Sequence, residues 1–184
     1  MTDTTLHARQ PRTEDVPSAA AMDWGGLCTR GAVAGLVAGS TFILANMWYA
    51  GAHGKPSVAP FLDISTVFHG SDMPNLNNAP FDVMVGAVTH FALSMAFGIV
   101  FALAVGIFRL ARMPMLLVLA ALSYGLALYV VNFQIIGRAF FTWFVDPNGP
   151  NQGFEVWIHP VGYGLFLLPF FLTVPSARRD HPGP

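Results

Sequence analysis

Two histidines, His90 and His159, lie inside long apolar segments of the sequence, where a polar side chain is costly and usually faces other protein groups. Imidazole can ligate haem iron, hold a transition metal or take up a proton near neutral pH. The pair could therefore bind haem, bind a metal or respond to protons. The structural alternative is that each ring forms a hydrogen bond with a neighbour such as Thr89, Asn46 or Asn132. The sequence leaves open whether the two histidines share a site.

Four further polar residues stand near the ends of two apolar segments: Asn46, Asn132, Gln134 and Arg138. Together with the histidines they would line a polar pocket at one end of the helices. The simpler interpretation is that the three amides form hydrogen bonds between helices. Arg138 is expected to keep its charge at the membrane surface and to pair there with an acidic side chain or a lipid phosphate. Binding of an anionic substrate is the alternative for this residue.

The sequence contains no GxSxG, HExxH or P-loop pattern. Its single cysteine, Cys28, can form neither an internal disulfide nor a cysteine-based zinc site. The acidic residues Asp82 and Glu155 lie only at the edges of apolar segments, which argues against a proton pump with carboxylates at depth. We therefore predict no catalytic residue, and an enzyme is the less favoured interpretation. The favoured expectation for cofactors is none.

The first long loop carries four residues of types that can ligate a metal, but their irregular spacing matches no known motif. They are His53, Asp63, His69 and Asp72. Surface residues of a loop are the simpler interpretation, and a metal site there stays an alternative.

Composition and hydropathy predict the elements that must position these residues. Of 184 residues, 54% are hydrophobic and only 10% are charged, whereas a soluble domain is about one quarter charged. Each apolar segment is long enough to cross about 30 Å of hydrocarbon as a helix. We predict an all-α, four-helix transmembrane bundle at 23–175, between a disordered tail at 1–22 and a second tail at 176–184. The spans are expected at about 25–50, 81–108, 114–136 and 154–174.

Basic residues lie mainly on one side of this bundle. Two of them, Lys55 and Arg138, fall in or beside the two longer loops. The others fall in the N-terminal flank, the short turn between the second and third spans, and the C-terminal tail: Arg9, Arg12, Arg30, Arg109, Arg112, Arg178 and Arg179. Because Lys and Arg are retained on the cytoplasmic side, both tails are expected in the cytoplasm. This predicts a multi-pass protein of the cytoplasmic (inner) membrane, N-in and C-in. The net charge of −1 without a basic run argues against nucleic-acid binding.

Gly31, Gly35 and Gly39 are spaced four residues apart and share one face of the first predicted helix. Such a face lets another helix backbone approach closely. It would serve either packing inside the bundle or contact with a second copy of the chain. The sequence does not separate these two uses.

The two halves of the chain share a short pattern. Asn46 is followed five positions later by Gly51, and Asn132 by Gly137, near the ends of the first and third spans. The following span in each half carries one of the two histidines. A helix–loop–helix unit used twice would explain the pattern, and chance is the alternative.

The second span contains the run VTHFALSMAFGIVF at residues 88–101. This run resembles the matching span of the YagU-like bacterial inner-membrane proteins, a family known chiefly as a domain of unknown function. The order of a first span, a long outer loop, a Thr-His span, a short basic turn and two further spans is also similar. The resemblance implies a bacterial cytoplasmic membrane. It implies no catalytic residue and no substrate.

Three functions follow as hypotheses. The leading one is a non-enzymatic accessory or oligomeric component of the lipid bilayer, acting through a homo-oligomer or a membrane-protein partner. The second is a haem- or metal-binding redox protein that uses His90 and His159. The third is a small oligomeric transporter or channel, with Asn46, Asn132 and Arg138 in its outer vestibule.

Overall fold

The computed structural model describes residues 23–69, 74 and 79–172. Within this part of the chain all regular secondary structure is helical, which confirms the predicted all-α class. The two predicted tails, 1–22 and 176–184, lie outside the described residues, as does the end of the fourth predicted span after Leu172.

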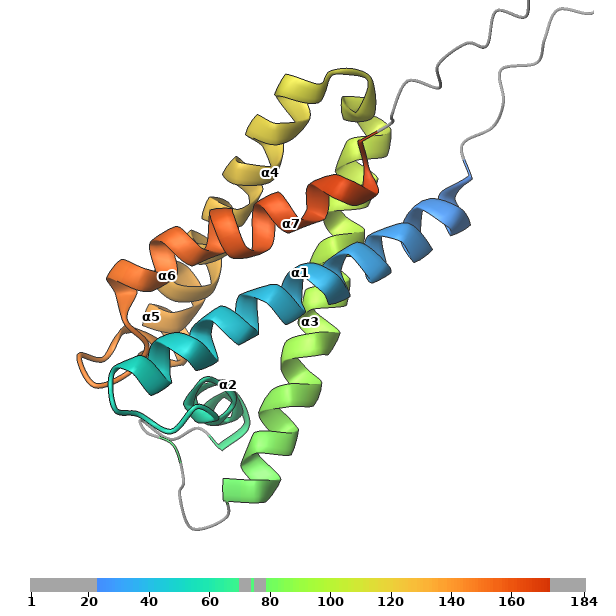
Figure 1. Ribbon diagram of the computed structural model, residues 1–184. Helices are drawn as coiled ribbons and strands as arrows, with labels where there is room; N and C mark the ends of the chain where they lie inside the picture. Colours follow the sequence, from blue (N-terminus) through green and yellow to red (C-terminus); the bar gives the residue numbers. More distant parts are fainter. Residues whose placement is uncertain (1–22, 70–73, 75–78, 173–184) are drawn as a thin grey trace, which may run out of the picture.

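The helices follow one another with short connections (Figure 1). The first half of the chain forms α1 (Trp24–Ala52), α2 (Ala59–His69) and α3 (Ala79–Ile107). After the short turn η2 (Leu110–Arg112), one long helix runs through α4 (Pro114–Tyr129), the π-helical segment η3 (Val130–Gly137) and α5 (Arg138–Phe140). The turn η4 (Thr142–Val145) leads to the last helix, which comprises α6 (Gln152–Ile158), the π-helical segment η5 (His159–Gly164), α7 (Leu165–Leu167) and η6 (Leu168–Phe170).

Residues with known preferences for helix ends define these boundaries. Asp23 precedes α1 and accepts a hydrogen bond at 2.9 Å from the backbone N–H of Gly26. Asn151 caps α6 in the same way, accepting from the N–H of Phe154 at 2.9 Å. Such caps satisfy N–H groups that have no partner inside the helix. Pro114 begins α4, a position where its missing N–H costs nothing.

In the described part of the chain, three helices are long and apolar enough to cross a membrane: Trp24–Ala52, Ala79–Ile107 and Pro114–Phe140. Their outward faces carry large apolar side chains that remain exposed, such as Leu44, Trp48, Val88 and Met115. Lipid covers such faces at no cost, whereas water does not. The chain is therefore a multi-pass integral membrane protein. Residues 152–170 form a fourth, shorter helix made of α-, π- and 3₁₀-helical parts.

The glycine face of α1 packs against α3 (Figure 1). A Cβ atom at Gly31 would lie 2.7 Å from the Ala102 side chain, and one at Gly35 would overlap the carbonyl oxygen of Ser94. Gly39 meets Ser94 and His90. The face predicted from the four-residue spacing is thus covered by α3 within one chain.

In the second half of the chain, α4 and η5 pack against each other through glycines in a similar way. Cβ atoms at Gly125 and Gly164 would overlap backbone atoms of η5 and α4 respectively. Two tyrosines then join the halves: Tyr124 donates to the carbonyl of Phe97, and Tyr163 to that of Ser94, each at 2.7 Å. Around these contacts lies a core of buried apolar residues that includes Ala34, Ala38, Phe101, Leu117, Ala121 and Leu167.

At one end of the bundle, α2 connects α1 to α3, and η4 leads from α5 to the last helix. We call this end the loop end. There α2 lies across the first turns of α3, where the carbonyl of Phe61 occupies the space that a side chain at Gly86 would need. Leu62, Ser65 and Thr66 of α2 are buried. In Figure 1, α2 lies between the last turns of α1 and the beginning of α3. The helices are thus held apart at the loop end.

Candidate functional site

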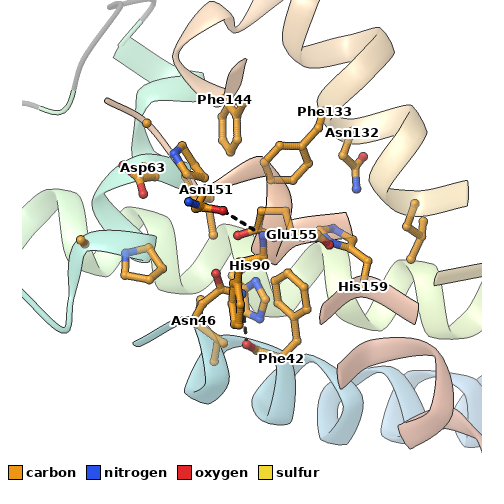
Figure 2. Close-up of a pocket in the computed structure, with 18 of the residues that line it drawn as sticks. Phe42, Asn46, Asp63, His90, Asn132, Phe133, Phe144, Asn151, Glu155 and His159 are labelled. Carbon is orange, nitrogen blue, oxygen red and sulfur yellow. Dashed lines mark hydrogen bonds and ion pairs between the residues drawn. The ribbon is translucent and has the colours of Figure 1, made fainter. Parts of the chain in front are cut away.

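A cavity of about 620 Å³ lies at the loop end (Figure 2). Its wall is formed by α1, α2, α3, η3, the chain from Phe141 to Asn151, and the last helix. Pockets that bind small molecules usually have volumes of about 300–1,000 Å³. The cavity therefore has the size of a binding site for an organic molecule.

Aromatic side chains make up much of the wall. Tyr49 stacks on Phe154 with ring centroids 4.1 Å apart, and Phe133 meets Phe144 edge to face at 5.5 Å. The aromatic residues of the wall are Phe42, Tyr49, Phe97, Phe133, Phe141, Phe144, Phe154 and Tyr163. Such a wall favours an apolar ligand with flat or bulky groups.

His90 reaches the cavity from α3 and is buried. Its Nε2 lies 2.9 Å from the carbonyl oxygen of Gly39, so this nitrogen carries the proton and donates. Ser94, one turn later on α3, has its hydroxyl 3.5 Å from the same nitrogen. Gly39 has no side chain, so the ring can reach this carbonyl. A Cβ atom at Gly39 would lie 3.4 Å from Nε2 of His90.

His159 and Glu155 reach the cavity from the last helix, one turn apart, and both are buried. Nδ1 of His159 donates to the backbone carbonyl of Glu155 at 2.8 Å. The same nitrogen lies 3.3 Å from Oε2 of the Glu155 carboxylate. That oxygen is buried and makes no hydrogen bond among the described residues.

The two histidines share this cavity, with one aromatic ring against both (Figure 2). Phe42 stacks on His90 at 6.0 Å between centroids and meets His159 edge to face at 4.6 Å. Asn46 and Asn132 also line the wall. The Asn and His residues of both sequence halves therefore meet at one cavity, and a duplicated unit stays a prediction.

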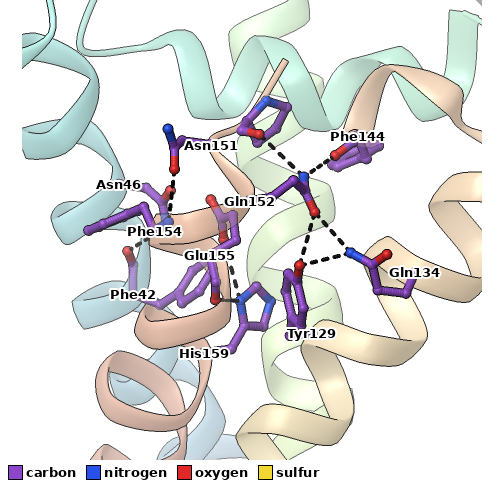
Figure 3. Close-up of polar contacts among 11 residues, drawn as sticks. Phe42, Asn46, Tyr129, Gln134, Phe144, Asn151, Gln152, Phe154, Glu155 and His159 are labelled. Carbon is purple, nitrogen blue, oxygen red and sulfur yellow. Dashed lines mark hydrogen bonds and ion pairs between the residues drawn. The ribbon is translucent and has the colours of Figure 1, made fainter. Parts of the chain in front are cut away.

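Gln134 belongs to a separate network beside the cavity (Figure 3), and Arg138 is bonded to it. Gln134 donates to Tyr129 at 2.8 Å and to Gln152 at 3.0 Å, and Tyr129 donates to Gln152 at 3.1 Å. Arg138 donates to Gln134 at 2.9 Å. This network joins η3 to α6, so these two predicted pocket residues brace the cavity wall.

Asp63 closes the cavity from α2 and links the two loops. It accepts a hydrogen bond at 2.7 Å from the indole N–H of Trp143. Lys55 donates to the carbonyl oxygens of Asn148 and Gly149 at 2.9 and 3.2 Å. Burial raises the pKa of Asp63 from 3.8 to about 6, and the Trp143 bond and the Lys55 charge lower it in part.

Both helices of the second half change to π-helix at the cavity. The segment η3 carries Asn132 and Phe133, and η5 begins at His159, just before Pro160. In a π-helical turn the backbone hydrogen bonds span five residues instead of four. The side chains are therefore rotated relative to their positions in an α-helix. Such segments are frequent at functional sites, which agrees with the position of this cavity.

Metal binding finds little support in this geometry. No group of three or more His, Cys, Asp or Glu side chains in the described part of the chain could hold a metal ion. His53 and Asp63 line the cavity, whereas Asp72 and the side chain of His69 lie outside the described residues. An axial haem pair would need both imidazoles to face one iron atom, but Phe42 lies between them in Figure 2. The haem hypothesis stays a prediction.

Two features of the cavity were not expected from the sequence. Glu155 was placed at the outer edge of a span, and Phe42 was not singled out. The spacing Glu-x-x-x-His at 155–159 puts both side chains on one helix face, and this signal could have indicated a shared site. No pattern in the sequence marks Phe42.

The chain matches no protein-family model, no curated protein and no solved structure. The resemblance to the YagU-like proteins therefore stays a prediction.

Proposed function

We propose that the protein crosses the bacterial cytoplasmic membrane four times, with both termini in the cytoplasm. Two arguments support this orientation. The helix at 152–170 packs along α4, and its 19 residues reach nearly 30 Å at about 1.5 Å per residue. Among the described residues, Arg30, Arg109 and Arg112 lie at the end of the bundle opposite α2, and the positive-inside rule places that end in the cytoplasm. The loop end and its cavity then lie in the outer half of the membrane.

Single cysteines test this orientation. In a Cys28→Ala background, Ser57→Cys and Asn148→Cys should react with a membrane-impermeant maleimide in intact spheroplasts. Met113→Cys, in the turn between α3 and α4, should react only after permeabilisation. Labelling of Met113→Cys in intact spheroplasts would overturn the proposed orientation.

We further propose that the protein binds a small, mainly apolar molecule in the loop-end cavity and acts as an accessory component of the membrane. The observation that carries this proposal is a space of about 620 Å³ with buried polar groups in its wall. A cleft of this volume with a mainly aromatic and apolar wall suits a small apolar ligand. The polar groups would fix its orientation.

A pair of neighbouring substitutions tests this binding function. Ile43 is 3% exposed and lines the cavity, whereas Leu44 is 62% exposed and faces outward. We expect wild type and Leu44→Phe in nanodiscs to bind the neutral fluorophore N-phenyl-1-naphthylamine with saturation, above empty nanodiscs. Ile43→Phe should bind it about tenfold or more weakly, a loss of about 1.4 kcal/mol.

Thermal unfolding checks that each variant is folded, and Val67→Phe, also in the wall, replaces Ile43→Phe if the latter is not. Binding that does not saturate in wild type, or that is equal in all variants, would contradict the proposal. Flux of a bound molecule into proteoliposomes would move the transporter hypothesis ahead of the accessory role.

A further inference from the structure

Glu155 places a buried oxygen without a hydrogen bond in the cavity wall. It is 4% exposed, and its Oε2 makes no hydrogen bond among the described residues. The nearest N–H, on Nδ1 of His159, is directed to the backbone carbonyl of Glu155 instead. An ionised carboxylate is costly to bury without such a bond. With His159 neutral, this oxygen is left for a hydrogen-bond donor or a positive charge supplied by a ligand.

The histidines add acceptors to this wall. His90 and His159 each use one ring nitrogen to donate to a backbone carbonyl. In the neutral ring the other nitrogen then carries a lone pair, which is Nδ1 in His90 and Nε2 in His159. Neither of these nitrogens has a recorded hydrogen bond in the described part of the chain. Both can accept a hydrogen bond from an N–H or O–H group of a ligand.

Several donors of the wall are in use. The hydroxyl groups of Thr89 and Tyr163 donate to backbone carbonyls at 2.8 and 2.7 Å. The Asn46 amide donates to the carbonyl of Phe42 at 3.3 Å. Lys55 donates to two carbonyls of the second loop. The side-chain amides of Asn132 and Asn151 remain as donors in the wall. The buried carboxylate and the two ring nitrogens are therefore the groups that favour a ligand with N–H groups.

Aromatic rings stand beside the carboxylate. Phe42 and Phe133 lie 4.6 and 5.4 Å from the His159 ring, centroid to centroid, and Figure 2 shows Glu155 among these residues. The face of an aromatic ring attracts a cation, and the apolar wall has room for a hydrocarbon tail. We propose that the cavity binds a lipophilic organic ammonium, with its N–H groups on Glu155 and its tail among the aromatic rings. This inference rests on the proposed binding function.

Glu155 rather than Asp63 is the expected counter-charge. Asp63 already accepts a hydrogen bond from Trp143, and its charge is partly compensated by the positive charge of Lys55. Among the described residues, the Glu155 carboxylate has one ion-pair partner, the His159 ring at 3.3 Å, and Asp63 is close enough to interact with it as a like charge. The two acids therefore make different predictions when each is replaced by its amide.

Displacement of N-phenyl-1-naphthylamine from protein in nanodiscs tests the inference. Three competitors share a phenylalkyl tail: 4-phenylbutylammonium, neutral 4-phenylbutanol and anionic 5-phenylpentanoate. We expect the ammonium to displace the fluorophore from wild type at about tenfold lower concentration than either of the others. Glu155→Gln should lose this preference. Asp63→Asn and Asp146→Asn, the latter outside the cavity wall, should keep it.

The outcomes separate the two proposals. A preference for the ammonium that persists in Glu155→Gln overturns the role of Glu155 as counter-charge. Equal displacement by all three competitors in wild type overturns the ammonium inference and leaves the binding function standing. Absence of saturable fluorophore binding in wild type overturns both.

Discussion

Replacing Gly35 by valine should prevent α1 from packing against α3 and leave little folded protein. A Cβ atom at this position would overlap the carbonyl oxygen of Ser94 and lie 2.9 Å from its carbonyl carbon and 3.0 Å from the Cα of Gly98. These are backbone atoms of a helix, which cannot rotate away as a flexible side chain can. Overpacking usually costs about 1–3 kcal/mol. We expect a cost of about 3 kcal/mol or more here, because the two helices must separate.

The measurement is the thermal unfolding temperature in mild detergent, together with the fraction of monodisperse protein. Gly25→Ala is the matched control, since it adds a Cβ to the first turn of the same helix, where the nearest atom is an Asp23 oxygen at 3.6 Å. That variant should behave as wild type. Unfolding of Gly35→Val at the wild-type temperature would show that α1 and α3 do not pack as described.

Gly35 also shows why the helices could be predicted from the sequence. Spacing along one helix is a local property, and glycines four residues apart must share a face whatever the rest of the chain does. The long apolar segments are local in the same sense, because lipid requires an uninterrupted helix of a given length. Class and helix positions therefore follow from composition and period.

The cavity depends on properties that are not local. Glu155 sits at the predicted edge of a span, yet α2 and the second loop fold over that edge and bury it. Phe42 is one of many aromatic residues in apolar segments, and only the positions of α3 and η5 place it between two histidines. Gln134 and Arg138 are grouped with the pocket by sequence position, but in the fold they lie outside its wall, although Asn132 of the same helix lines it.

The second large effect concerns pH and Asp63. Burial raises the pKa of this carboxyl from 3.8 to about 6 in the folded protein. The folded state therefore favours the protonated form, and the stability that this provides is complete below about pH 4 and is lost as the pH rises through about 6. A difference of about two pKa units corresponds to about 3 kcal/mol. The contribution of Asp63 to the free energy of unfolding should therefore decrease by about 3 kcal/mol between pH 4 and pH 7.

Asp63→Asn isolates this contribution, because asparagine is neutral at every pH and keeps an oxygen to accept from Trp143. The unfolding temperatures of the variant and of wild type should be close at pH 4. At pH 7 the variant should be the more stable of the two. Asp146→Asn, on the second loop and outside the cavity wall, should follow wild type across the range. If the stability gain of Asp63→Asn instead shrinks as pH rises, then ionised Asp63 stabilises the fold, and its bond from Trp143 outweighs the cost of burial.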